Sequence, residues 1–157
     1  MTTDSDKVIL GKLEVMKHIH KVRSLLYRMI EELDRRAREH DQSKLEGIEA
    51  ELYGEYTPEL AKCEYMSEDY KKLLEKVRPA IEHHYAVSRH HPEHFAQGID
   101  DMTLVDLIEM LVDWKAATER NKNGNIRTSI EKNIERFKIS PQLAQILQNT
   151  VREMFRD

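Results

Sequence analysis

Apolar residues recur at helical spacing along most of this chain, and this periodicity narrows the choice of fold more than any other feature. From about residue 8 to residue 39 they follow one another at steps of three and four, beginning with Ile9, Leu13 and Met16. No run alternates clearly between polar and apolar residues, and only five glycines and four prolines interrupt the 157 residues. The sequence therefore predicts an all-α protein, a single-domain helical bundle over residues 1–157 with about six to seven helices.

Capping residues predict where several of these helices begin. Ser67, which two acidic residues follow, is expected to start one helix, and Thr103 is expected to start the next. Ser140 precedes a proline, a pair that is typical of a helix start. Residues 54–69 are expected to form a loop with one short helix at most, after a helix at about 41–54.

The composition and charge argue against several classes of protein. A net charge of −4 argues against binding to a nucleic-acid polymer or to an anionic membrane. Cys63 is the only cysteine, so an intrachain disulfide and a cysteine-rich zinc site are both excluded. The N-terminal stretch lacks the apolar core of a signal peptide, and no window approaches the roughly 20 apolar residues of a membrane span. We expect a cytoplasmic protein, and the sequence leaves a homo-oligomer open.

Five of the eight histidines lie in one short stretch, EHHYAVSRHHPEH, at residues 82–94. If the preceding helix continues through it, His84 and His91 fall on its apolar line, and His83 and His90 fall on the shoulder of that face. His90 would join the first pair if the helix unwinds before the following proline. Imidazoles that face a core need polar partners, so the stretch predicts metal ligands. The alternative is a helix end that carries histidines for solubility or capping.

Two other stretches place possible ligands on helices. His18 lies on the apolar line of its helix, whereas His20 points about 200° away from it. His40 and Asp41 are adjacent, and an imidazole with a carboxylate suits Mn, Fe, Zn or Ni better than calcium. Lys44 adds a cation on the same side of the chain as Asp41. Taken singly, each of these residues also fits a structural or surface role.

A carboxylate interrupts an apolar helix in the segment DLIEMLVDW. Asp113 is flanked by Val112 and Trp114 and shares a helical face with Met110. A carboxylate in that position is either a metal ligand or the partner of a buried base, and Glu109 is a lesser candidate on the same side. The alternative is that this face is the solvated side of an amphipathic helix.

Taken in chain order, these residues resemble the HD superfamily of metal-dependent phosphohydrolases, which is named for its His-Asp doublet. HDQSK at 40–44 is similar to the superfamily's His-Asp-x-x-Lys signature, and HIHKV at 18–22 resembles its first-ligand helix. Asp113 matches the isolated later aspartate, and the additional histidines resemble members with two or more metals, such as the HD-GYP phosphodiesterases. More narrowly, HDQSK, HHPEH, EMLVDWKAA and RFKISPQLAQILQNT resemble a small, largely uncharacterised family of phage and bacterial HD-like proteins. The resemblance covers residues 18–150.

The resemblance implies an HD-type helical fold that binds one or two divalent transition-metal ions, with Mn, Fe, Ni, Co and Zn as candidates. The residues implied for the first ion are His18, His40, Asp41 and Asp113. Those implied for the second are His84, His91 and, as a further candidate, His90, with Asp41 bridging both ions. The catalytic residues implied are Asp41 and Lys44. Asp41 would hold both ions, and Lys44 would neutralise charge on the phosphate. Further candidate contacts to substrate are Lys115, Arg120 and Arg127.

The function that this constellation implies is hydrolysis of a nucleotide or related small phosphoester by a metal-activated water. The phosphate-binding patterns GxxxxGK[ST] and GxGxxG are both absent. Cys63 has no activating base beside it in the sequence, so covalent catalysis has little support. Two alternatives stay open: a di-iron oxygenase of the same type, and a non-catalytic metal-binding or interaction protein. Metal identity and a panel of phosphoester substrates would separate the three.

Overall fold

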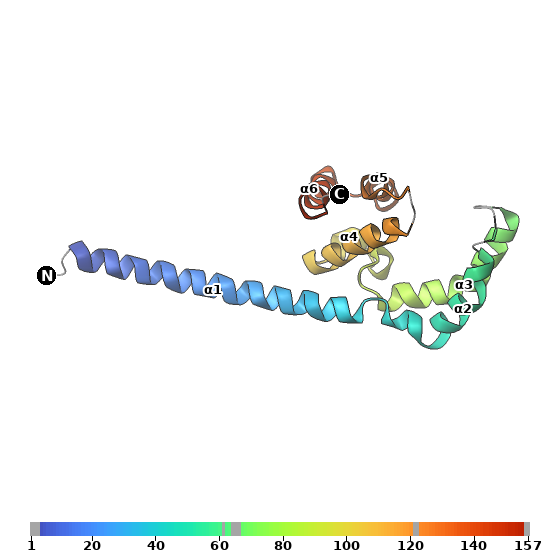
Figure 1. Ribbon diagram of the computed structural model, residues 1–157, viewed down its shortest axis with the longest axis horizontal. Helices are drawn as coiled ribbons and strands as arrows, with labels where there is room; N and C mark the ends of the chain where they lie inside the picture. The colour runs from blue at the N-terminus through green and yellow to red at the C-terminus, as the bar shows by residue number, and fades with distance from the viewer. Residues whose placement is uncertain (1–3, 61, 64–66, 121–122, 156–157) are drawn as a thin grey trace. The chain divides into compact units, whose positions relative to one another are not determined.

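The computed structural model describes residues 4–60, 62–63, 67–120 and 123–155, and over these residues the protein is all α-helical, as predicted. Figure 1 shows the order of the elements along the chain. They are α1 (Asp4–Glu39), η1 (Gln42–Leu45), α2 (Gly47–Leu60), α3 (Glu68–Val87), η2 (Pro92–His94), η3 (Gly98–Asp101), α4 (Leu104–Glu119), α5 (Ile126–Phe137) and α6 (Pro141–Met154), where η denotes a 3₁₀ helix. Within the described part of the chain, none of the helices is both long and apolar enough to cross a membrane.

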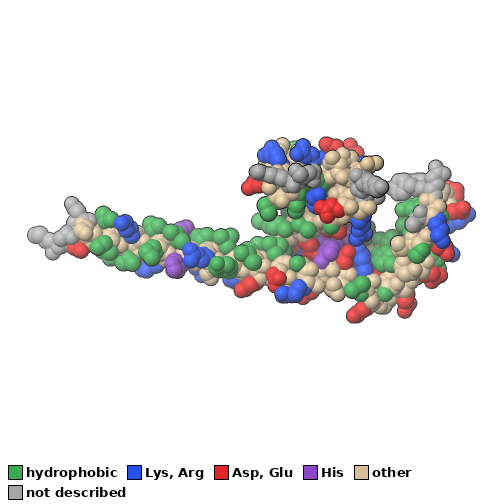
Figure 2. Space-filling view, viewed as in Figure 1, with side chains coloured by type: hydrophobic (Ala, Val, Ile, Leu, Met, Phe, Trp, Pro, Cys, Tyr) green, Lys and Arg blue, Asp and Glu red, His purple; other side chains and the backbone are tan. Residues whose placement is uncertain are grey.

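The chain divides into two compact units, Met1–Arg38 and Glu39–Asp157. The first unit consists of α1, and the helix predicted from about residue 8 to residue 39 is confirmed. Its apolar side chains between Val8 and Ile30 are 39–58% exposed. They are visible as green side chains along the helix in Figure 2. The first unit is thus a single long amphipathic helix.

The hydrophobic core of the second unit lies among α4, α5 and α6, which Figure 1 shows next to one another. Its buried members include Leu111, Ile126, Ile130, Leu147 and Val151. Trp114 of α4 stacks on Phe137 of α5, with ring centroids 6.2 Å apart. Full burial of one aliphatic side chain of this core stabilises the fold by about 1.5–3 kcal/mol. This packing fixes the rotation of α4 about its axis, and so the direction of the polar residues that α4 carries.

The predicted helix starts are confirmed by their capping hydrogen bonds. Ser67 Oγ accepts a hydrogen bond from the Tyr70 amide at 3.1 Å, and Ser140 caps α6 in the same way. Thr103 and Asp106 form a reciprocal capping box at the start of α4. The Asp106 carboxylate also accepts two hydrogen bonds from Arg89, at 2.9 and 3.1 Å. The start of α4 is thereby tied to the segment that follows α3.

The region around α2 differs from the sequence prediction. A helix was expected at about 41–54, but residues 42–45 form η1 and α2 continues through Pro58 to Leu60. The expected loop over 54–69 is therefore wrong for its first part, while residues 61 and 64–66 lie outside the described residues. A proline inside a helix costs one backbone hydrogen bond. The packing of α2 along α3 offsets that loss, and the two helices run side by side in Figure 1.

Candidate metal centre

A sharp corner after α1 brings the two residues of the His-Asp doublet together. Asp41 has a φ of 59°, in the left-handed region that aspartate adopts more readily than most residues. This conformation starts η1 and lets Lys44 Nζ donate to Asp41 Oδ2 at 2.6 Å. His40 Nε2 lies 3.6 Å from the same oxygen. The Asp41 carboxylate thus lies next to both the Lys44 ammonium and the His40 imidazole.

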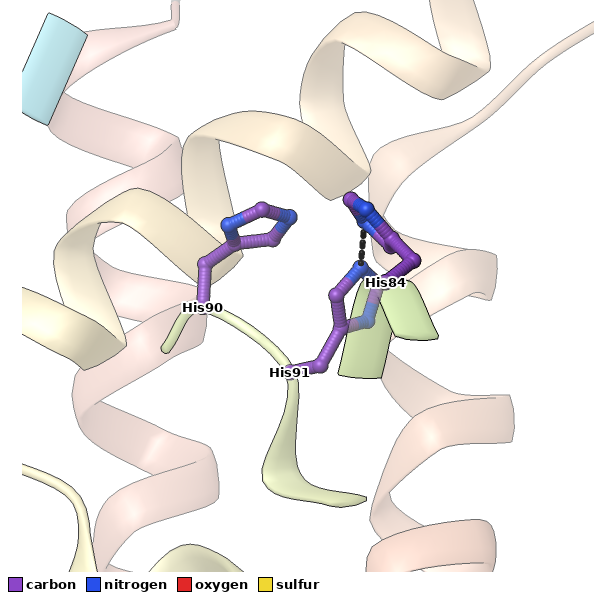
Figure 3. Close-up of side chains that lie close together, drawn as sticks. All are labelled: His84, His90 and His91. Carbon is purple, nitrogen blue, oxygen red and sulfur yellow. Dashed lines mark hydrogen bonds between the residues drawn. The ribbon is translucent and has the colours of Figure 1, made fainter. Parts of the chain in front are cut away.

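The histidine-rich segment contributes from a helix end and from the turn that follows. Because α3 ends at Val87, the prediction that His90 and His91 continue its helical line is wrong. The residue before a proline is disfavoured in the helical region, and His91 is extended, with φ −100° and ψ 126°. The turn directs His90 inward, where it is 3% exposed. Figure 3 shows its ring beside His84 and His91, whose Nε2 atoms are 3.0 Å apart.

A buried carboxylate of α4 sets the direction of two of these imidazoles. Glu109 Oε1 lies 2.9 Å from His40 Nδ1 and 3.1 Å from His90 Nδ1. A histidine that donates from Nδ1 keeps a free lone pair on Nε2. The Nε2 atoms of His40 and His90 lie 3.6 and 3.5 Å from the oxygens of Asp41. Asp113 Oδ1 lies 3.7 Å from His40 Nε2 and completes this side of the cluster.

These atoms fit a bound metal ion. Among the described residues, donor atoms within 4.8 Å of one another form three groups, which are His84, His90 and His91; His40, His90 and Glu109; and His40, Asp41 and Asp113. Within the described part of the chain, Asp41 Oδ1 and His90 Nε2 are buried without a hydrogen-bond partner. The two atoms face each other at 3.5 Å, and a cation bound by both would satisfy them. A mixed set of imidazoles and carboxylates suits first-row transition metals.

Electrostatics divides the imidazoles into charged and neutral ones. Asp113 and Glu109 raise the pKa of His40 to about 10. Burial, together with the neighbouring His90 and His84, lowers the pKa of His91 to about 3, and burial also lowers that of His84. At neutral pH, His84 and His91 are therefore neutral, as ligands must be. His40 carries a proton that a metal would displace.

The two carboxylates at the centre stay ionised despite their burial. Burial alone would raise the pKa of Asp41, but the Lys44 ammonium, together with His40 and His84, holds the pKa below its usual range. In the same way, burial would raise the pKa of Asp113, but His40, His90 and Lys44 together lower it. Both carboxylates therefore remain negative at neutral pH. Figure 2 shows histidine and acidic side chains next to each other on the second unit.

Besides Lys44, which contacts Asp41, four predicted residues lie outside these groups. His18 lies in the first unit, where its side chain is exposed, and it belongs to none of the three groups among the described residues. Lys115 and Arg127 line a cavity of about 510 Å³ whose lining includes no member of the groups. Lys115 is two residues from Asp113 and so points about 200° away from it around α4. Arg120 is exposed at the end of α4.

Sequence reasoning missed Glu49 altogether and gave Glu109 a minor place. Glu49 lies on α2 and is 0% exposed. Its two carboxylate oxygens contact His83 Nδ1 at 2.7 Å and His84 Nδ1 at 2.9 Å. The sequence offers little signal for this role, because α2 carries three further glutamates. What distinguishes Glu49 is its position against α3, which only the packing of the two helices reveals.

The chain matches no curated protein and no solved structure. Residues 10–153 match a protein family described as a family of unknown function, DUF5662. The matched stretch includes every residue of the three groups described above, together with Lys44 and Glu49. Since the match covers more than half of the sequence, the chain belongs to the DUF5662 family.

Proposed function

We propose that the protein is a metal-dependent phosphohydrolase that acts on a nucleotide or a related small phosphoester. The observation that carries this proposal is the facing pair of buried, unsatisfied atoms, Asp41 Oδ1 and His90 Nε2. A buried carboxylate oxygen against an imidazole nitrogen is unfavourable unless a proton or a metal cation lies between them, and a metal ion would satisfy both atoms at once. The resemblance of the doublet and of Asp113 to the HD superfamily then points to phosphoester hydrolysis.

The residues that would hold metal fall into two neighbouring sets. His40, Asp41 and Asp113 form one, to which the resemblance adds His18. His84, His90 and His91 form the other, with Asp41 between the two sets. Bound ions would lower the pKa of a coordinated water and polarise a phosphoryl oxygen. The ions proposed are Mn, Fe, Co, Ni or Zn.

Lys44 is the residue of this chain that we propose contacts the phosphate. Its ammonium lies 2.6 Å from Asp41 Oδ2, and its side chain is 37% exposed. It is therefore next to the metal ligands and still accessible to a phosphate that arrives from solvent. In this position it would bind a phosphoryl oxygen and neutralise the negative charge that develops during hydrolysis. Asp41, which holds Lys44 in place, links the cation to the metal ligands.

A turnover screen of metal-loaded protein tests the proposal. The protein is reconstituted with Mn²⁺, Fe²⁺, Co²⁺, Ni²⁺ or Zn²⁺, and phosphate and pyrophosphate release from a panel of nucleotides are measured separately. We expect turnover with at least one metal and its loss in Asp41→Asn, because asparagine keeps the left-handed backbone but removes the charge. Asp100→Asn is the matched control, since Asp100 is exposed on η3 and outside the three groups.

The alternatives give different results in the same screen. Oxygen consumption by the iron-loaded protein without phosphoester hydrolysis would replace the proposal with an oxygenase. Bound metal with neither activity would indicate a metal-binding protein without catalysis. Less than about 0.2 equivalents of metal after reconstitution with every ion would overturn the metal centre itself.

A further inference from the structure

The buried carboxylate of Glu49 has no place in the ligand sets described above. We propose that Glu49 is a positioning residue that keeps the His84 proton on Nδ1, so that the Nε2 lone pair faces Asp41 and is free to bind a metal. The inference rests on the metal centre of the proposed function, but not on the reaction that takes place there.

The contacts of Glu49 and His84 join two elements that pack tightly. Glu49 Oε2 of α2 lies 2.9 Å from His84 Nδ1 of α3, and the two residues are 0% and 2% exposed. A hydrogen bond from an N–H to a buried carboxylate is stronger than one to a neutral acceptor. The bond therefore favours the tautomer in which Nδ1 carries the proton.

Two hydroxyl groups also lie near His84 Nδ1, but they do not compete with the carboxylate. Ser43 Oγ is 3.3 Å away and Ser88 Oγ is 3.2 Å away, both farther than the Glu49 oxygen. The Glu49 carboxylate is also hydrogen-bonded to His83 Nδ1 and to the Ser43 hydroxyl. An ionised carboxylate can only accept hydrogen bonds. Glu49 therefore decides which His84 nitrogen carries the proton.

The other nitrogen of His84 faces the metal ligands. Its Nε2 lies 3.3 Å from Asp41 Oδ1 and 3.0 Å from His91 Nε2, and Figure 3 shows the two rings meeting at these nitrogens. A proton on His84 Nε2 would bond to Asp41 and would occupy the lone pair that a metal needs. Carboxylates that fix the tautomer of a ligating histidine commonly contribute 10–100-fold in metal affinity, so about that factor depends on Glu49.

The direct test is a long-range ¹H–¹⁵N correlation spectrum of the ¹⁵N-labelled, metal-free protein at a pH at which His84 is neutral. The His84 signals are identified by their loss in His84→Gln. We expect a protonated Nδ1 and an unprotonated Nε2 for His84. This measurement needs no metal, no substrate and no variant of Glu49, so a failure of the phosphohydrolase proposal would leave its result unaffected.

Substitution of Glu49 then tests whether this residue sets the tautomer of His84. Glu49→Gln keeps the shape but offers one oxygen to the three groups that now bond to the carboxylate, and its amide can donate to His84 Nδ1. We expect the proton of His84 to shift toward Nε2 and Zn²⁺ affinity, measured by calorimetry, to fall about 10–100-fold. Glu51→Gln is the matched control, because it makes the same change at an exposed position of α2 and should alter neither readout.

Two results would overturn the inference. One is a wild-type spectrum with the His84 proton on Nε2. The other is a folded Glu49→Gln protein that keeps both the wild-type tautomer and the wild-type affinity for Zn²⁺. If Glu49→Gln fails to fold by circular dichroism, the wild-type spectrum alone decides.

Discussion

At the scale of single residues, the direction of a side chain decides whether a histidine is a ligand. His18 and His20 are two residues apart on α1, and their side chains differ by about 200° in direction. His18 lies on the apolar line of the helix, and the resemblance to the HD superfamily adds it to the ligands proposed for the first metal. We therefore expect His18→Ala to weaken Zn²⁺ binding at least about tenfold and His20→Ala to leave it unchanged, as measured by calorimetry. If the two variants bind Zn²⁺ with equal affinity, His18 is not a ligand.

The same scale shows which site residues the sequence can reveal. Asp113 and His84 are visible in the sequence because they interrupt apolar helical lines, and the structure places both in the cluster. His90 depends on where α3 ends, and so on a backbone turn that side-chain periodicity does not describe. Glu49 and Glu109 are harder to recognise, because an acidic residue on an amphipathic helix is ordinarily solvated. Only tertiary packing shows that these two are turned inward.

At the scale of elements, two glycines have opposite structural roles. Gly54 lies inside α2, and a Cβ added there would meet nothing within 4 Å, whereas at Gly124 it would lie 1.8 Å from the Thr118 carbonyl oxygen. Alanine is favoured over glycine in a helix by about 1 kcal/mol. We expect Gly54→Ala to raise the free energy of unfolding by about that amount in urea denaturation. Gly124→Ala should lower the free energy of unfolding. If both changes stabilise the protein, the close approach of Gly124 to the Thr118 carbonyl is contradicted.

The elements themselves were largely predictable, because caps and periodicity are local signals. Ser67, Thr103 and Ser140 each begin a helix as expected. The errors fall where packing outweighs local preference. α2 continues through Pro58 because it packs along α3, and α3 ends before His90 although histidines and apolar residues would continue its pattern. Neither outcome follows from the residues of one helix alone.

At the scale of the whole molecule, two imidazoles give the metal-free protein opposite dependences on pH. The pKa of His40 is raised to about 10, so its contribution to stability is present below pH 6.5 and is lost as the pH rises toward 10. The pKa of His91 is lowered to about 3, so its contribution is present above pH 6.5 and is lost as the pH falls toward 3. Urea denaturation in EDTA should therefore show the greatest stability near pH 6.5. His40→Gln should flatten the alkaline side and His91→Gln the acidic side, and unchanged profiles would contradict the assigned charges.

The hydrogen bond between Glu109 and His40 also has a consequence for the order of folding. It joins residues 69 positions apart, whereas α2 and α3 are neighbours along the chain and pair early. Closing so long a loop costs chain entropy before its contacts form. During synthesis, the doublet and the histidine-rich segment leave the ribosome before α4, so the nascent chain carries the imidazoles without Glu109 and Asp113. The proposed centre is complete only once α4 docks, so a metal ion bound by its imidazoles together with Asp113 would be captured after that step.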